Sequence, residues 1–261
     1  MEYQTLTVSI DDKVAAVTLN RPDLRNAFNE QTIAELALAF DELGRHQGVR
    51  AIVLAANGPA FCAGADLNWM KKMAGYSHSE NQQDAARLAD MLRTIYLCPK
   101  PTVAKVQGDC YAGGMGLVAA CDIVVASEVA HFCLSEVKLG LIPATISPYV
   151  IKAMGEQAAR RYFLTAERFD AAEARRIGFV HEVVAADALD VTVAGIVKSL
   201  VTNSPNAVGE AKKLVRDVVG QPVDEALLAD TANRIAEIRA STEGREGVGS
   251  FLEKRKPTWL N

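Results

Sequence analysis

The chain has 261 residues, of which 49% are hydrophobic and 23% are charged, and its net charge is −4 at pH 7. This composition is ordinary for a globular protein and excludes a disordered or fibrous chain. The slight excess of acidic residues argues against a general nucleic-acid binder, because neutralising phosphates requires a basic face. A chain of this length buries roughly 70–75% of its unfolded surface, so it needs no disulfide bonds for stability.

Strand and helix patterns alternate through the first 140 residues. Alternating apolar residues on both sides of Asp11-Asp12-Lys13 predict a hairpin. Asn29 is expected to cap a helix that is apolar at helical spacing, and Ser79 with Gln82 predicts a capping box for a helix ending near Leu97. The predicted strands, in chain order, are 5–10, 14–19, 51–56, 102–106 and 123–126.

After residue 140 the pattern is mainly helical. Asp170 with Glu173 predicts another capping box, and Ser204-Pro205 a helix start with proline at its first position. The predicted helices are 187–201, 204–218, 223–239 and a last one ending in 251–256. We therefore predict an α/β core over residues 1–200 and a helical C-terminal region over residues 201–261.

Two turns rich in small residues are candidates for chemistry. One is Phe61–Leu67, which leads into a helix near Asp66, and the other is a loop over Gly108–Gly116 with Gly113-Gly114 at a predicted helix start. Unpaired N–H groups at such places favour developing negative charge, so one donor from each turn would form an oxyanion hole. The alternatives are tight turns that serve packing alone, and a dinucleotide fingerprint over Gly114–Ala119, which lacks a strand directly before it.

Glu136 is the most suggestive acidic residue, because it follows an apolar strand pattern at the start of a loop. A partly buried glutamate there would act as an acid/base with a raised pKa. The alternative is a salt bridge to Lys138. Trp69, Met70 and Met73 lie at helical spacing and suit either the core or a pocket for an acyl chain.

The remaining signals concern metal, compartment and membrane. The four histidines lack ligand spacing, so we predict no metal site. The five cysteines are odd in number and contain no C-x-x-C, which favours buried thiols in a reducing cytosol. The first residues, Met1-Glu-Tyr-Gln-Thr, lack the pattern of a signal peptide, and no apolar run approaches the ~20 residues of a membrane span. We expect a cytoplasmic protein.

Taken together, the motifs resemble those of the enoyl-CoA hydratase/isomerase (crotonase) superfamily over nearly the whole chain. They are, in order, Leu19–Pro22, Arg25–Phe28, Phe61–Leu67, Gly113-Gly114, Cys121–Ile123, Phe132–Pro143 and Phe251–Lys256. Their order and spacing make the resemblance specific.

The resemblance implies a spiral of ββα units with a C-terminal helical region that forms a trimer, or a dimer of trimers. It implies an acyl-CoA substrate whose thioester oxygen accepts hydrogen bonds from the backbone N–H groups of Ala65 and Gly113, with Glu136 as the acid/base. CoA is then part of the substrate, and no separate cofactor, membrane or nucleic acid is expected. The positions implied to hold the nucleotide are Arg25, Ala27, Ala63, Asp66 and Leu67, and, from a neighbouring subunit, Phe251 and Lys254.

Two departures from the family pattern matter for function. Hydratases of this family carry a second glutamate where this chain has Gly116, and many relatives have a glycine cluster where it has Pro143–Pro148. The combination resembles bacterial 3-methylglutaconyl-CoA hydratases of leucine breakdown and their acyclic-terpene counterparts. A Δ3–Δ2-enoyl-CoA isomerase remains the alternative, since one carboxylate suffices for it. RNA binding, as in some relatives, is a third reading that the net charge disfavours.

Overall fold

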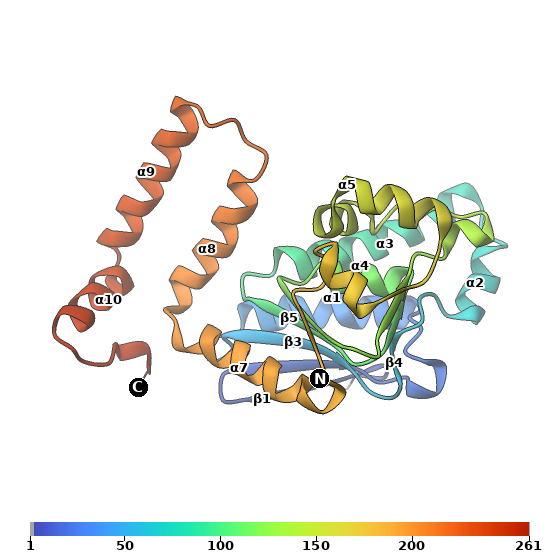
Figure 1. Cartoon of the computed structure of the whole chain (residues 1–261), viewed down its shortest axis with the longest axis horizontal. Helices are drawn as coiled ribbons and strands as arrows, with labels where there is room; N and C mark the ends of the chain where they lie inside the picture. Colours follow the sequence, from blue (N-terminus) through green and yellow to red (C-terminus); the bar gives the residue numbers. More distant parts are fainter. Residues whose placement is uncertain (1–2, 261) are drawn as a thin grey trace.

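The computed structural model describes residues 3–260 (Figure 1). Met1 and Glu2, the first residues of the segment expected not to be a signal peptide, lie outside the described residues. One sheet has six strands in the order β1-β2-β3-β5-β7-β10, and a second has four in the order β4-β6-β8-β9. The strands are β1 (Leu6–Asp11), β2 (Val14–Leu19), β3 (Ala51–Ala56), β4 (Ala60–Cys62), β5 (Thr102–Val106), β6 (Asp109–Tyr111), β7 (Ile123–Ser127), β8 (His131–Cys133), β9 (Phe169–Asp170) and β10 (Glu182–Val184).

From β3 to β8, successive strands alternate between the two sheets. β3, β5 and β7 are parallel neighbours in the large sheet, and β4, β6 and β8, which follow each of them directly, are parallel neighbours in the small one. Each strand pair is followed by helix before the next pair begins. This is the repeated ββα arrangement that the resemblance implied, and it confirms the predicted α/β fold class.

The large sheet is buried because helices cover both of its faces. Ile52, Ala104 and Val124 point to the main core, which includes α1 and α3, whereas Val53, Val103 and Val125 pack against α7. Strands enclosed on both sides read as continuous apolar runs, which is why Ala51–Ala56 lacks polar alternation.

The helices complete the chain. They are α1 (Glu30–Arg45), α2 (Leu67–Met73), α3 (His78–Leu97), α4 (Gly113–Ala119), α5 (Ser147–Thr165), α6 (Ala171–Arg176), α7 (Leu189–Thr202), α8 (Pro205–Val218), α9 (Glu225–Ala240) and α10 (Thr242–Leu252), with short 3₁₀ helices η1 (Pro22–Leu24), η2 (Glu136–Leu139), η3 (Ala186–Ala188) and η4 (Thr258–Leu260).

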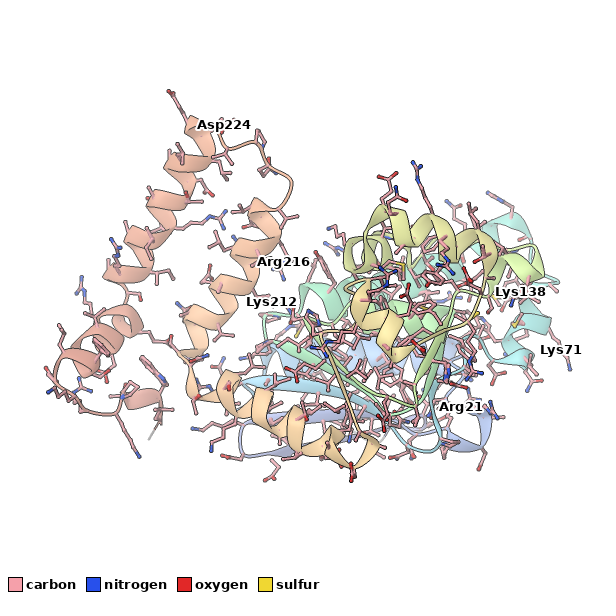
Figure 2. All side chains as sticks on the ribbon, in the orientation of Figure 1. Arg21, Lys71, Lys138, Lys212, Arg216 and Asp224 are labelled. Carbon is pink, nitrogen blue, oxygen red and sulfur yellow. The ribbon has the colours of Figure 1, made fainter. Side chains whose placement is uncertain are left out.

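Helices α8, α9 and α10 extend from one side of the α/β core, opposite the side that carries α2 (Figure 1). Lys212 and Arg216 on α8 attach this extension, and both side chains point toward the core (Figure 2). Lys212 Nζ lies 2.7 Å from Asp122 Oδ2, and Arg216 donates to the carbonyl of Tyr96. The role of residues 201–261 in oligomerisation stays a prediction.

Several local predictions need correction. The cap of α3 is Ser77 with Glu80 rather than Ser79 with Gln82, and both hydrogen bonds of its capping box form. Asp170 caps α6, but the Glu173 carboxylate bonds Tyr162 and Arg176 instead of completing a box. The predicted caps at Asn29 and Ser204 are confirmed.

The loop predicted over Gly108–Gly116 contains β6 and the first half of α4, so a strand does lead into the glycines. The dinucleotide interpretation nevertheless fails, because α4 has only seven residues and lies in a ββα repeat. The other unpredicted strands, β4, β9 and β10, have two or three residues each, and β8 confirms the apolar strand pattern expected before Glu136.

All five cysteines are buried free thiols. Within residues 3–260, no group of three His, Cys, Asp or Glu side chains is arranged to hold a metal. Over the same residues, no helix is both long and apolar enough to cross a membrane.

Candidate active site

Three neighbouring strands of the small sheet end at one edge and lead to three candidate residues. Ala65 follows β4, Gly113 follows β6 and Glu136 follows β8, each within three residues of the strand end. The order β4-β6-β8 is parallel throughout, so the carboxyl ends of these strands meet at the same edge. Because neighbouring strands lie about 4.8 Å apart, the sheet brings the three positions together.

The segment around Ala65 is held by Phe28. The N–H of Phe28 donates to Gly64 at 2.9 Å, and the N–H of Asp66 donates to the carbonyl of Phe28 at 3.0 Å. This isolated bridge pairs Phe28 with Ala65, yet the Ala65 N–H donates to no acceptor within residues 3–260. The bridge therefore fixes the backbone of Ala65 and leaves its donor free for a ligand.

Gly113 begins α4, so its N–H has no acceptor in the preceding turn of helix. Its neighbour Ala112 has φ 48° and ψ −123°, a strained conformation for a residue with a side chain, and donates to the carbonyl of Cys133 at 2.8 Å. A Cβ on Gly113 would lie only 2.3 Å from Cζ of Phe28, so a side chain here requires the Phe28 ring to shift. Phe28 therefore contacts the second donor with its ring while its backbone fixes the first.

The two turns also touch each other directly. A Cβ on Gly64 would lie 3.1 Å from the Cβ of Ala112, and Gly64 has φ 93°. Trp69 on α2 is buried, and its ring centroid lies 5.8 Å from that of Phe28. This aromatic pair supports the backbone of both turns from the core side, so Trp69 belongs to the core.

Glu136 opens η2 directly beyond β8. Its Oε2 atom is buried and has no hydrogen-bond partner among the described residues, and Lys138 does not contribute to the pKa shift of this carboxyl, so the alternative salt bridge is not supported. Burial raises the pKa of this carboxyl above its ordinary value of 4.5. Glu136 is half-buried, and a hydrogen bond from its own backbone acts against the rise in pKa. A buried carboxylate oxygen without a partner is costly for stability, so it is more consistent with proton transfer than with a structural role.

The raised pKa of Glu136 predicts a shifted pH profile. If the ionised carboxylate accepts a proton from water, kcat/KM falls as the pH falls through this pKa. We expect the acidic limb of kcat/KM to lie above pH 4.5 in wild type. A limb at or below 4.5, measured with a substrate that does not itself titrate in this range, would contradict the assignment.

Asp66, one of the positions expected to bind the nucleotide, also caps α2 and pairs with Arg21. Its Oδ1 caps α2 by accepting from the N–H of Asn68 at 2.8 Å, and its Oδ2 lies 2.8 Å from Nη2 of Arg21. The Arg21 pair and the cap lower the pKa of the buried Asp66 carboxyl, although its burial acts in the opposite direction. Its side chain and its N–H, which donates to Phe28, are thus occupied, and its carbonyl already accepts from the N–H of Met70, so its expected contact with a nucleotide stays a prediction.

The structure brings five of the seven expected nucleotide-binding positions together. The N–H of Ala63 donates to the carbonyl of Arg25 at 3.0 Å, so the segments 25–28 and 63–67 run side by side. The positions on these two segments are Arg25, Ala27, Ala63, Asp66 and Leu67. Arg21, Lys71 and Lys138 lie on this side of the molecule (Figure 2), a distribution of positive charge that suits a polyanion.

Phe251 and Lys254 are not brought to this site within one chain. Phe251 lies at the end of α10 and is 82% exposed, and α10 belongs to the extension on the other side of the core (Figure 1). Their expected contact with a nucleotide requires the neighbouring subunit and stays a prediction.

Gly116 has no room for any side chain. A Cβ there would lie 2.3 Å from Cγ2 and 2.8 Å from Cβ of Ile146, which is itself 2% exposed. Ile146 belongs to the departing segment Pro143–Pro148. The two departures from the family pattern, Gly116 and the segment Pro143–Pro148, are therefore in direct contact. Ile146 fills the space beside Gly116.

The roles of Phe28 and Ile146 were missed by sequence reasoning. For Ile146 a signal exists: a glycine inside a helix, where no turn requires it, indicates a close approach of another group. For Phe28 there is none, since its contact with Gly113 joins residues 85 positions apart.

Comparisons with known proteins agree with this geometry. The enoyl-CoA hydratase/isomerase family profile matches residues 9–261. A solved enoyl-CoA hydratase from Shewanella pealeana is 43% identical with a TM-score of 0.96, and the match covers 99% of this chain and 97% of that one. A Thermus thermophilus protein assigned as an enoyl-CoA hydratase is 35% identical over 94% of this chain and 96% of its own length. A mevalonyl-coenzyme A hydratase of Aspergillus fumigatus is 34% identical over 94% of this chain and 91% of its own length.

Proposed function

The chain belongs to the enoyl-CoA hydratase/isomerase family and is an enoyl-CoA hydratase, and we propose that its substrate is a branched enoyl-CoA, 3-methylglutaconyl-CoA or a close relative. The observation that carries the proposed reaction is the meeting of two free main-chain donors and one half-buried carboxylate, whose Oε2 atom has no partner, at a single sheet edge. CoA enters as part of the substrate, and the proposed reaction needs no separate cofactor.

The proposed reaction uses these three groups in sequence. Glu136 accepts a proton from a water molecule whose oxygen bonds to the β-carbon of the substrate. The electron pair of the double bond moves toward the thioester oxygen, and the N–H groups of Ala65 and Gly113 stabilise the resulting enolate. Glu136 then returns the proton to the α-carbon, giving the 3-hydroxyacyl-CoA. One carboxylate balances the reaction because it first accepts the proton and then donates it.

Two observations support a branched acyl group. The pattern of the site segments resembles the bacterial 3-methylglutaconyl-CoA hydratases, and the Aspergillus relative is named for a branched acyl-CoA. The single carboxylate also supports a second candidate, a Δ3–Δ2-enoyl-CoA isomerase, in which Glu136 moves a proton between two carbons.

A panel of acyl-CoA esters tests the proposal and separates the two candidates. Hydration removes the absorbance of the conjugated thioester, whereas isomerisation of a Δ3-enoyl-CoA creates it. We expect kcat/KM for hydration to be highest with 3-methylglutaconyl-CoA and lower with crotonyl-CoA. A preference for straight-chain substrates would refute the branched assignment, and activity on Δ3-enoyl-CoA alone would establish the isomerase.

We further propose that the protein assembles as a homotrimer or a dimer of trimers, so that Phe251 and Lys254 of one subunit reach the nucleotide bound to another. Lys254→Ala is then expected to raise KM for the CoA ester about ten-fold and to leave kcat nearly unchanged, because a remote charge–phosphate contact acts equally on bound substrate and transition state. Steady-state kinetics measure both constants. Lys256→Ala, an exposed lysine two residues away, is the matched control, and equal KM values in the two variants would reject the assignment.

A further inference from the structure

The contact between Ile146 and Gly116 links two parts of the site. Gly116 lies one turn along α4 from Gly113, the first residue of that helix. Ile146 is the residue before α5 and lies so close that no Cβ fits on Gly116. Leu92 of α3 also lies close, because its Cδ2 atom would be 3.5 Å from a Cβ on Gly116. The start of α5 is therefore seated directly on the backbone of α4.

The same segment carries Glu136 at its other end. The N–H of Leu141 donates to the carbonyl of Glu136 at 3.1 Å, which closes η2. From there only a few residues lead to Ile146, and their path is restricted by Pro143. α5 itself packs against both α4 and η2. A displacement of Ile146 away from α4 would therefore be transmitted to η2.

From this geometry we propose that Ile146 is a positioning residue: its contact with Gly116 sets the distance between the Glu136 carboxylate and the Gly113 donor. The inference rests on the proposed function of these two groups. The positions 116 and 146 act as one unit, in which a side chain can occupy the space from α5 or from α4, but not from both.

Gly116→Ala tests the proposal. The added methyl group overlaps Ile146 and separates α5 and η2 from α4, so we expect kcat to fall by about 10- to 10²-fold, the scale for a small misplacement of a reacting group. KM should change little, because the expected nucleotide-binding segments 25–28 and 63–67 are not displaced. Gly195→Ala is the control, since a Cβ at this helical glycine meets no atom within 4 Å.

Adding Ile146→Gly to Gly116→Ala restores the space that the new methyl group needs. In Gly116→Ala/Ile146→Gly both overlapping Ile146 atoms are absent, and the next nearest atom, Cδ2 of Leu92 at 3.5 Å, is at ordinary contact distance, so we expect most of the lost kcat to return. Glycine is tolerated at the residue that precedes a helix. Ile146→Gly alone removes the contact without any overlap, so it remains informative if Gly116→Ala does not fold. It is expected to lower kcat and to shift the acidic limb of the pH profile, which a purely structural contact would not do.

An unchanged kcat in both single variants, or a loss in Gly116→Ala that Ile146→Gly does not relieve, would overturn the proposal. Thermal unfolding of wild type, Gly116→Ala, Ile146→Gly and the double variant tests the steric contact without relying on activity. Its outcome is therefore independent of whether the proposed function is correct. If wild type shows no hydration, the proposed function fails, and the same variants are then scored on isomerisation, which uses the same carboxylate. A Tm that is lower in Gly116→Ala than in the double variant supports the steric contact in either case.

Discussion

Replacing Gly113 with proline is expected to lower kcat by about 10²–10³-fold, the usual cost of one oxyanion donor. Proline has no N–H, so the substitution removes the donor itself, which no side-chain deletion can do. Gly113 is the first residue of α4, a position where proline fits a helix. Steady-state kinetics on the best substrate of the panel measure the effect.

The proline ring also introduces a Cβ that overlaps Phe28, and this effect must be separated from the loss of the donor. Gly113→Ala is the matched control, because it introduces the same Cβ and keeps the N–H. The ratio of the two kcat values reports the donor alone, provided that both variants keep the Tm and the assembly state of wild type. If the two variants turn over equally, no oxyanion forms at Gly113 and the thioester-enolate mechanism is wrong for this chain.

Glu136→Gln is expected to lower kcat by at least ~10²-fold while KM changes little, because the amide keeps the size of the side chain but cannot accept the proton. The position beside it on α4 offers no substitute, since Gly116 cannot carry a carboxylate while Ile146 is in place. Kinetics with saturating acyl-CoA measure the loss, and direct titration of a substrate analogue checks binding.

The stability of this variant provides its control. Partial burial raises the folded-state pKa of Glu136, so its ionisation lowers the free energy of unfolding: stability is highest below about pH 4.5 and falls as the pH rises through the folded-state pKa. At neutral pH the half-buried charge is poorly solvated, and Glu136→Gln should unfold at a temperature no lower than that of wild type. Near-normal turnover in a stable variant would exclude Glu136 and direct attention to Asp109, Tyr111 and Tyr149.

The long elements could be predicted from sequence because their patterns extend over many residues. The hairpin of β1 and β2, the buried strand β3 and the caps of α1 and α8 all follow from local periodicity and capping residues. Two strands that lead to the site, β4 and β6, could not, because three residues are too few to show alternation, and β8 was indicated only by an apolar run before Glu136. Their pairing depends on contacts between ββα units rather than on any local signal.

For the site, the sequence identified the candidate residues but not the contacts that hold them in place. The small-residue turns and Glu136 were chosen as candidates, and the sheet edge brings their positions together. The restraint of Ala65 by Phe28 and the strain at Ala112 were not predictable, because each depends on a backbone path set by distant segments. The ion pair of Arg21 with Asp66 likewise joins residues that only the fold brings into contact.

Two of the three groups at the sheet edge are main-chain amides, and this has a consequence for how such a protein can diverge. Every amino acid except proline carries an N–H, so most point mutations at Ala65 leave the donor chemically intact. Selection at these positions therefore acts on the path of the backbone and on the small side chains that permit it, rather than on chemical identity. Only Glu136 can be lost by exchanging one functional group for another. Under the proposed mechanism, lineages can thus replace the residues that line the acyl group, and change substrate, while the main-chain donors proposed to stabilise the enolate are inherited unchanged.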